Sequence, residues 1–317
     1  MYMSLPIFLL GVVGNTLTVL VMRRRVFAKT TAAVYLTMLA IADTCLLVTG
    51  IPHEWLEWFS IDLDTWPCRV HRFLFYISSD VGMWTIVLFT FDRFVAVCFP
   101  LHKRSVCAPR RAFAAFGFIV LLWIIKNLHV FWTRGPEYHD GVLWRQCGYL
   151  AEYSDFEYYI RPWIVFGFIM AAPFCIVLFL NCLIVNNLLR SQRMRAGSAS
   201  SAMIRNQSFR QTTVMCLSIS FTFLVCIAPS IVLIIGKPYW KSPGEQNTAY
   251  DISKVINNQL VYLNHAINFC LYCMTGQRFR SELATMFGRP PKKDSMQVST
   301  PVTGEMKPGF TYSESLC

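Results

Sequence analysis

Six polar side chains recur along one apolar stretch near the C-terminal end of the chain, and their spacing places them on one helical face. They follow one another at intervals of four, four, three, three and four residues, which matches the α-helical period of about 3.6. They are Lys254, Asn258, Tyr262, His265, Asn268 and Tyr272. Inside a membrane such a face must look towards protein or water. The pattern therefore predicts a hydrogen-bonded, wetted interior that opens near Lys254, whereas a chance scatter would not easily give one face.

Three charged residues lie inside other apolar stretches: Asp43, Asp80 and Lys126. A charge in a membrane helix costs about 2.5 to 3.5 kcal/mol on insertion scales, so each needs an interior position or a partner. Counting from Arg93 and Arg111 at a rise of about 1.5 Å per residue puts Asp80 and Lys126 at the same depth, about 20 Å from one face. We expect them to form a buried ion pair, which either joins two helices or contacts a ligand.

Patterns for enzymatic, metal or cofactor chemistry do not stand out. The Cys and His residues lack zinc-site spacing, no Gly-rich phosphate loop follows a strand, and no Ser, His and Asp arrangement is distinctive. The sequence therefore predicts no enzyme, no metal ion and no cofactor.

The elements that must position these residues are long apolar helices. The chain has 317 residues, of which 55% are hydrophobic and only 15% charged, compared with about 25% charged in soluble domains. Seven stretches can cross about 30 Å of hydrocarbon. They cover residues 2–22, 34–52, 70–98, 112–132, 162–189, 212–235 and 252–274. The predicted fold class is an all-α membrane protein, a bundle of seven transmembrane helices followed by a short amphipathic eighth helix over 277–287 on the cytoplasmic side.

The distribution of charge predicts the orientation. The net charge of +11 would favour nucleic-acid binding in a soluble protein, but Lys and Arg gather in alternate connecting segments while the others carry more acidic residues. The basic segments are 23–33, 99–111, 190–211 and 275–317. The positive-inside rule makes them cytoplasmic, which predicts a plasma-membrane protein with an extracellular N-terminus, a cytoplasmic C-terminus and no nucleic-acid partner. Because Arg23 to Arg25 follow the first apolar run, we expect it to be a retained span rather than a signal peptide.

Two of the twelve cysteines, Cys68 and Cys147, lie in the external segments. External compartments are oxidising, so we expect these two to form a disulfide. The alternative is a pair of unrelated free thiols.

Short motifs in order along the chain, from about residue 11 to 287, carry a family resemblance. They are Gly14-Asn15, Leu39-Ala40-Ile41-Ala42-Asp43, Cys68, Asp92-Arg93-Phe94, Trp123, Pro173, the segment from Phe223 to Pro229, and Asn268-Phe269-Cys270-Leu271-Tyr272. As a set they resemble the rhodopsin-like, or class A, G protein-coupled receptors.

The resemblance implies an activation switch that couples to a heterotrimeric G protein. Arg93 would contact the G protein after the sixth span swings outward, with Asp92 restraining it at rest. Leu101 would dock into the G protein, and Pro229 would kink the sixth span. The implied switch residues are Asp92, Arg93, Leu101, Phe223, Pro229, Asn268 and Tyr272.

Several positions depart from the family pattern. The family's usual Tyr, Trp and Tyr are replaced by Phe94, Ile227 and Asn181, respectively. In the seventh span Asn268 is followed by Phe269 rather than by a proline, which should soften the kink of that helix. The residues that resemble the family's polar core, a sodium and water site, are Asn15, Asp43, Asn264 and Asn268. The serine expected from the third span is Gly82, which leaves sodium binding open.

The class of ligand can be narrowed in two ways: by residues that some ligand classes require and this chain lacks, and by the composition of the external segments. Phe75 stands where amine receptors place an Asp, and no lysine lies in the middle of the seventh span for a retinal Schiff base. The acidic, Trp-rich outer segments over a polar interior favour a short cationic peptide, and the Asn-Phe-Cys-Leu-Tyr-Cys run resembles invertebrate receptors for FMRFamide-type and other amidated neuropeptides. Expected ligand-binding residues are Glu54, Arg72, Phe75, Tyr76, Lys254, Asn258 and Tyr262. A non-peptide small molecule or a chemosensory ligand is the alternative.

Two regions organise the chain. Residues 1–288 would form the receptor domain, and 289–317, rich in Pro, Ser, Thr and Lys, a disordered cytoplasmic tail whose phosphorylation would recruit an arrestin. The basic face of the eighth helix would bind membrane lipid. A transporter or channel is the competing class, but it would need repeated halves or an ion path, and the altered switch positions leave open a receptor that no longer signals.

Overall fold

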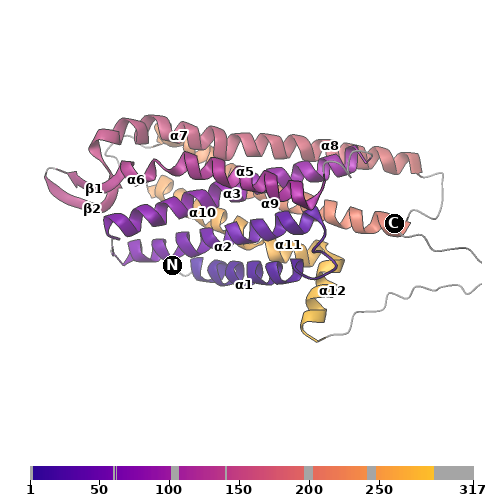
Figure 1. Ribbon diagram of the computed structural model, residues 1–317. Coiled ribbons are helices and arrows are strands. Elements are labelled where there is room, and N and C mark those ends of the chain that lie inside the picture. The colour runs from indigo at the N-terminus through magenta and orange to yellow at the C-terminus, as the bar shows by residue number, and fades with distance from the viewer. Residues whose placement is uncertain are drawn as a thin grey trace, which may run out of the picture.

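The computed structural model describes residues 3–59, 61, 63–100, 107–139, 141–195, 203–240 and 248–288. Its long helices lie side by side, with a short hairpin at one end of the bundle and a short helix running across the other end (Figure 1). The predicted all-α membrane bundle is therefore confirmed.

The first four spans are nearly uninterrupted helices. They are α1 (Ser4–Met22), α2 (Thr31–Trp58), α3 (Thr65–Cys98), and α5 (Pro109–Asn127) with the single turn α6 (Val130–Thr133). The fifth span begins with irregular turns: η1 (Ala151–Tyr153), the π-helical η2 (Phe156–Ile160), α7 (Arg161–Ile164) and the π-helical η3 (Val165–Ala171), followed by α8 (Ala172–Arg195). The sixth is α9 (Met203–Trp240), which runs through Pro229 as one helix.

Six described helical stretches are long and apolar enough to cross a membrane. The seventh predicted span consists of α10 (Thr248–Ala266) and α11 (Asn268–Thr275), whose polar stripe lowers its hydropathy. The two helices are separated only by Ile267, and hydrogen bonds from Ile267 N to Leu263 O (2.9 Å) and from Leu271 N to Ile267 O (3.1 Å) continue the helical bonding pattern across it. The span is thus interrupted at this point without a proline.

Helix α3 occupies the centre of the bundle, where it contacts α2, α5, α8 and α9. The largest cluster of buried apolar side chains surrounds it and includes Leu36, Phe89, Ile219 and Phe223. Helix α1 packs closely against α11 at Gly14, where an added Cβ would lie 2.7 Å from the Cβ of Phe269. The middle of the bundle is therefore where side chains from several helices meet.

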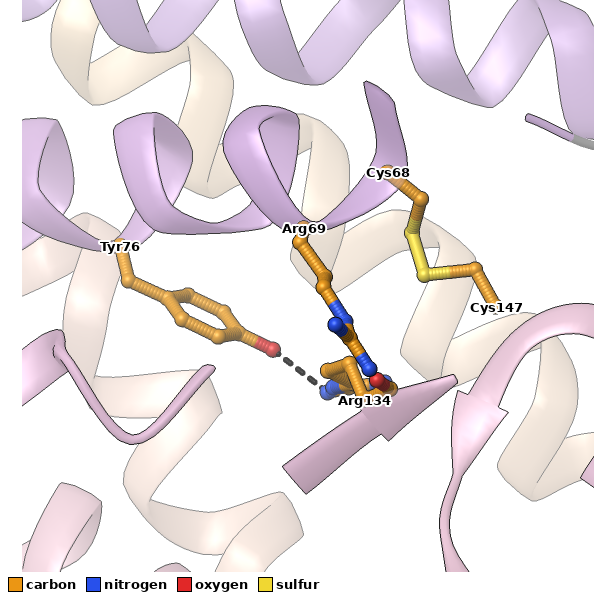
Figure 2. The surroundings of a disulfide bond; sticks show 5 residues. All are labelled: Cys68, Arg69, Tyr76, Arg134 and Cys147. Carbon is orange, nitrogen blue, oxygen red and sulfur yellow. Dashed lines mark hydrogen bonds between the residues drawn. A yellow bond between two sulfur atoms is a disulfide. The ribbon is translucent and has the colours of Figure 1, made fainter. Parts of the chain in front are cut away.

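The connection between the fourth and fifth spans is an antiparallel hairpin, which the pattern of apolar stretches does not predict. Strand β1 (Arg134–His139) pairs with β2 (Val142–Tyr149), and Gly141 adopts φ +76° in the turn between them, a conformation that favours glycine. A disulfide between Cys68 and Cys147 ties β2 to the first turn of α3 (Figure 2). The predicted disulfide is therefore present.

Helix α12 (Gln277–Met286) runs across the end of the bundle (Figure 1). Its Phe279 is buried, with ring centroids 5.8 Å from Phe269 and 5.6 Å from Tyr272. The first residue of the predicted apolar face thus enters the bundle rather than facing a membrane. Contact of the helix with lipid stays a prediction, and the tail from residue 289 lies outside the described residues.

Candidate functional site

A cavity of about 240 Å³ opens at the hairpin end of the bundle, between α2, α3 and α10. It is lined by Gly50, His53, Glu54, His71, Arg72, Phe75, Asn258, Val261 and Tyr262. Most of the expected ligand-binding residues therefore come together here. Gly50 makes the space, because a Cβ at this position would lie 2.7 Å from Cε1 of Tyr262 and 2.8 Å from the ring of Phe75.

The cavity wall carries charges of both signs. Glu54 comes from α2 and Arg72 from α3, and Gln259 Nε2 lies 3.5 Å from Glu54 Oε2. The rings of His53 and His71 stack at 4.5 Å with an interplanar angle of 13°. Carboxylate, guanidinium, imidazole and aromatic surfaces together suit a polar ligand that itself carries charged and apolar groups.

Two of the expected ligand-binding residues lie elsewhere. Tyr76 points towards the hairpin, where its hydroxyl accepts a hydrogen bond of 2.8 Å from Arg134 Nη2 (Figure 2). The guanidinium of Arg134 also stacks 3.7 Å over the ring of Tyr149, and burial raises the pKa of the Tyr149 phenol. Lys254 is exposed on the outermost turns of α10. Tyr76 therefore contacts the hairpin rather than the cavity. Lys254 lies on α10, which lines the cavity, but Lys254 itself does not.

Asp80 of α3 and Lys126 of α5 lie in contact. Lys126 Nζ is 3.1 Å from Asp80 Oδ2, and the side chain of Asp80 is 4% exposed. Asn127, which the sequence analysis did not single out, donates a hydrogen bond of 2.7 Å to the same oxygen and accepts one of 3.2 Å from Lys126. The pair is therefore a three-residue network that joins two helices.

A second polar cluster lies in the middle of the bundle. His265 Nδ1 of α10 lies 2.6 Å from Asp43 Oδ1 of α2, and Asn268 Nδ2 of α11 donates to Asp43 Oδ2 at 2.7 Å. Asn15 of α1 donates to the backbone oxygen of His265 at 3.1 Å. The structure thus brings Asn15, Asp43 and Asn268 together around His265. The sequence places His265 on the polar stripe but does not predict its contact with Asp43. Asn264, the remaining expected member, is buried one residue away.

Arg93 is held at the opposite end of the bundle from the cavity. Its guanidinium forms an ion pair with Asp92, and its Nη2 donates a hydrogen bond of 3.1 Å to the hydroxyl of Thr31. That hydroxyl in turn donates to Asp92 Oδ2 at 3.1 Å. Arg93 and Asp92 are both buried, so the arginine is restrained inside the bundle. Thr31 begins α2, and no sequence signal marked it.

The remaining switch residues pack between these two ends. Phe223 and Tyr272 are fully buried, whereas Pro229 is half-buried. Beside Pro229, Ser230 Oγ donates to Asn257 Oδ1 at 2.8 Å, which links α9 to α10. Leu101 lies outside the described residues. Among the residues that the structure describes, no group of three or more His, Cys, Asp or Glu side chains could hold a metal ion.

Comparison with known proteins agrees with this architecture. The family model described as "7 transmembrane receptor (rhodopsin family)" matches residues 14–272.

Similar curated proteins include receptors named for galanin, thyrotropin-releasing hormone and pyrokinin. The human galanin receptor type 2 is 25% identical, covering 94% of this chain and 76% of the receptor. The thyrotropin-releasing hormone receptor of Gallus gallus is 24% identical over 90% of this chain and 77% of its own length. The pyrokinin-1 receptor of Drosophila melanogaster is 24% identical over 92% and 80%. These relatives are receptors, not enzymes. The bundle that matches the family model also holds a cavity at one end, a buried polar core and a restrained arginine, and the chain belongs to the rhodopsin family of seven-transmembrane receptors.

Proposed function

We propose that this receptor binds a short, amidated neuropeptide at the outer cavity and activates a heterotrimeric G protein at its inner end. The observation that carries the proposal is the cavity, which combines Glu54 and Arg72 with the aromatic walls Phe75 and Tyr262. Its volume of about 240 Å³ is below the roughly 300 to 1,000 Å³ of pockets for drug-sized ligands. It would therefore receive one end of a peptide while the rest contacts the hairpin.

The names of the relatives support a peptide ligand. Galanin, thyrotropin-releasing hormone and pyrokinin receptors all match this chain over nine-tenths or more of its length. An amidated terminus lacks the negative charge of a free carboxylate, so it could lie near Glu54 without repulsion between two anions, while a cationic side chain of the peptide would be attracted to Glu54.

The inner end supports G protein coupling. Asp92 and Thr31 hold Arg93 in place, and release of a buried, restrained arginine is a change that agonist binding could favour. The positive-inside rule places the basic segments in the cytoplasm, so the cavity would face the extracellular side of the plasma membrane. In this orientation α12 would lie along the inner leaflet. The phosphorylated tail would recruit an arrestin.

The experiment that tests this function is a screen of short amidated peptides, each beside its free-acid form, for nucleotide exchange by G proteins in membranes that contain the full chain. We expect at least one amidated peptide to accelerate exchange. Glu54→Gln should raise its half-maximal concentration by about tenfold or more, because a charged hydrogen bond is lost, while the matched change at the exposed outer residue Glu152, Glu152→Gln, should not.

Three outcomes would contradict the proposal. Exchange that responds only to small molecules would favour the non-peptide alternative. Ion or solute flux without nucleotide exchange would favour a transporter or channel. Failure of every peptide and G protein would favour a receptor that no longer signals.

A further inference from the structure

Both oxygens of the Asp43 carboxylate already contact side chains of the receptor. Oδ1 lies 2.6 Å from Nδ1 of His265, and Oδ2 accepts the 2.7 Å hydrogen bond from the amide of Asn268. Asp43 and His265 are each 1% exposed at the side chain. The carboxylate that the family resemblance assigns to a sodium ion is thus satisfied from within the chain.

The imidazole also lies on the α3 side of this carboxylate. At Gly82 of α3, an added Cβ would lie 3.5 Å from Cε1 of His265 and 3.6 Å from Asp43 Oδ1. These are ordinary van der Waals distances, so the ring reaches from α10 to the surface of α3. A glycine there supplies no side-chain oxygen, and the ligand that a cation would need from α3 is missing.

The chemistry of the contact opposes a metal ion as well. A proton lies between Nδ1 and Oδ1 whichever atom carries it, because two such atoms approach to 2.6 Å only through a hydrogen bond. The nitrogen lone pair is therefore not available to a cation, and a hard cation such as sodium prefers oxygen ligands over imidazole. The residues present do not fit a bound sodium ion.

We propose that His265 replaces the sodium ion in the polar core of this receptor, so that the core binds no sodium. The link between α2 and α10 is then a permanent part of the chain, extended to α1 by the bond from Asn15 to the backbone of His265. A sodium-dependent receptor would respond to the ion's concentration, whereas this one would not. The inference concerns the polar core alone and does not depend on which ligand or G protein the receptor uses.

Thermal unfolding of the purified full-length receptor tests this without an agonist. The melting temperature is measured from about 15 to about 150 mM NaCl, with choline chloride keeping the ionic strength constant. A ligand that binds only the folded state raises the melting temperature with its concentration. We expect no difference between sodium and choline for the natural sequence.

Four variants identify the histidine as the cause. His265→Ser removes the ring and offers a hydroxyl, so sodium should raise the melting temperature by about 2 to 4 °C. Gly82→Ser adds the oxygen from α3 but keeps the ring, so it should remain insensitive to sodium. The double variant should show the largest shift, and adding Asp43→Asn to it should abolish the shift.

The proposal is overturned if sodium, but not choline, stabilises the natural receptor and Asp43→Asn removes that effect. It is also overturned if Gly82→Ser alone gains a sodium response as large as that of the double variant. If His265→Ser does not fold, His265→Ala serves in its place. The comparison of sodium with choline on the natural sequence needs neither His265 variant, because a sodium response there contradicts the proposal directly.

Discussion

At the level of single residues, the network around Asp80 shows how this bundle accommodates charge. Asp80 is almost completely buried, while the side chain of Lys126 retains 22% exposure. Asn127 satisfies the same carboxylate oxygen, and Lys126 lies 5.6 Å over the ring of Trp123. Removing one member of a buried ion pair leaves the other without compensation, which is more costly than removing both.

A double-mutant cycle measures this coupling. We expect Asp80→Asn and Lys126→Met each to destabilise the receptor by about 3 kcal/mol, the lower end of the usual range because Lys126 is partly exposed. The double variant should lose less than the sum of the two. Unfolding of the purified receptor and its level at the cell surface are the measurements.

The exposed pair between Arg24 and Glu282 provides the matched control. Arg24 Nε lies 3.2 Å from Glu282 Oε2, and the Arg24 side chain is 44% exposed. The same cycle there should give about 1 kcal/mol or less, because solvent screens exposed ion pairs. Single variants at Asp80 and Lys126 that leave both stability and surface level unchanged would show that the buried pair has no structural role.

Sequence patterns predict some residue contacts and miss others for a clear reason. Asp80 and Lys126 share a depth that can be counted from the basic ends of consecutive spans. Asp43 and His265 lie on spans far apart in the sequence, and helical periodicity shows which residues share a face but not which neighbouring helix that face meets. Thr31 and Asn127 are ordinary polar residues whose role depends entirely on such contacts.

At the level of elements, Gly50 controls how closely α2 approaches α3 and α10 beside the cavity. A methyl group there would collide with the rings of both Phe75 and Tyr262. Aromatic side chains packed between helices can yield only by moving the helices or leaving their rotamers, which costs about 1 to 3 kcal/mol.

Alanine substitution at two glycines separates this contact from helix propensity. Gly50→Ala should lower stability by about 1 to 3 kcal/mol and weaken binding of the peptide identified by the screen, because it fills the cavity. Gly117→Ala, on α5 with nothing within 4 Å of the added Cβ, should stabilise slightly or have no effect. Equal effects of the two substitutions on thermal unfolding and peptide binding would contradict the assigned role of Gly50.

The helices themselves could be predicted well, because length and apolarity determine where a chain crosses a membrane. The elements that were missed or altered depend on other forces. The β1–β2 hairpin carries no strong alternating pattern and is tied to α3 by the disulfide. Phe279 enters the bundle because Phe269 and Tyr272 leave an aromatic site for it, which the spacing along α12 alone does not reveal.

At the level of the whole molecule, α2 connects the cavity at one end of the bundle with Arg93 at the other. Thr31, at its first turn, holds Arg93; Asp43, midway, joins the polar core; and Glu54, near its last turn, lines the cavity. At the helical rise, Thr31 and Glu54 are about 35 Å apart. A ligand that shifts α2 at one end would therefore act on the restraint of Arg93 at the other, and the same helix passes through the core held by His265.

The cavity and Arg93 are predicted to face opposite compartments, and epitope tags at the two ends of the bundle test this prediction. One tag is placed in the hairpin turn at Gly141 and another after Gly288, and antibody labelling is compared in intact and permeabilised cells. We predict labelling of the Gly141 tag in intact cells and of the Gly288 tag only after permeabilisation. Labelling of both tags in intact cells, or of neither, would place the two ends in one compartment and contradict the account.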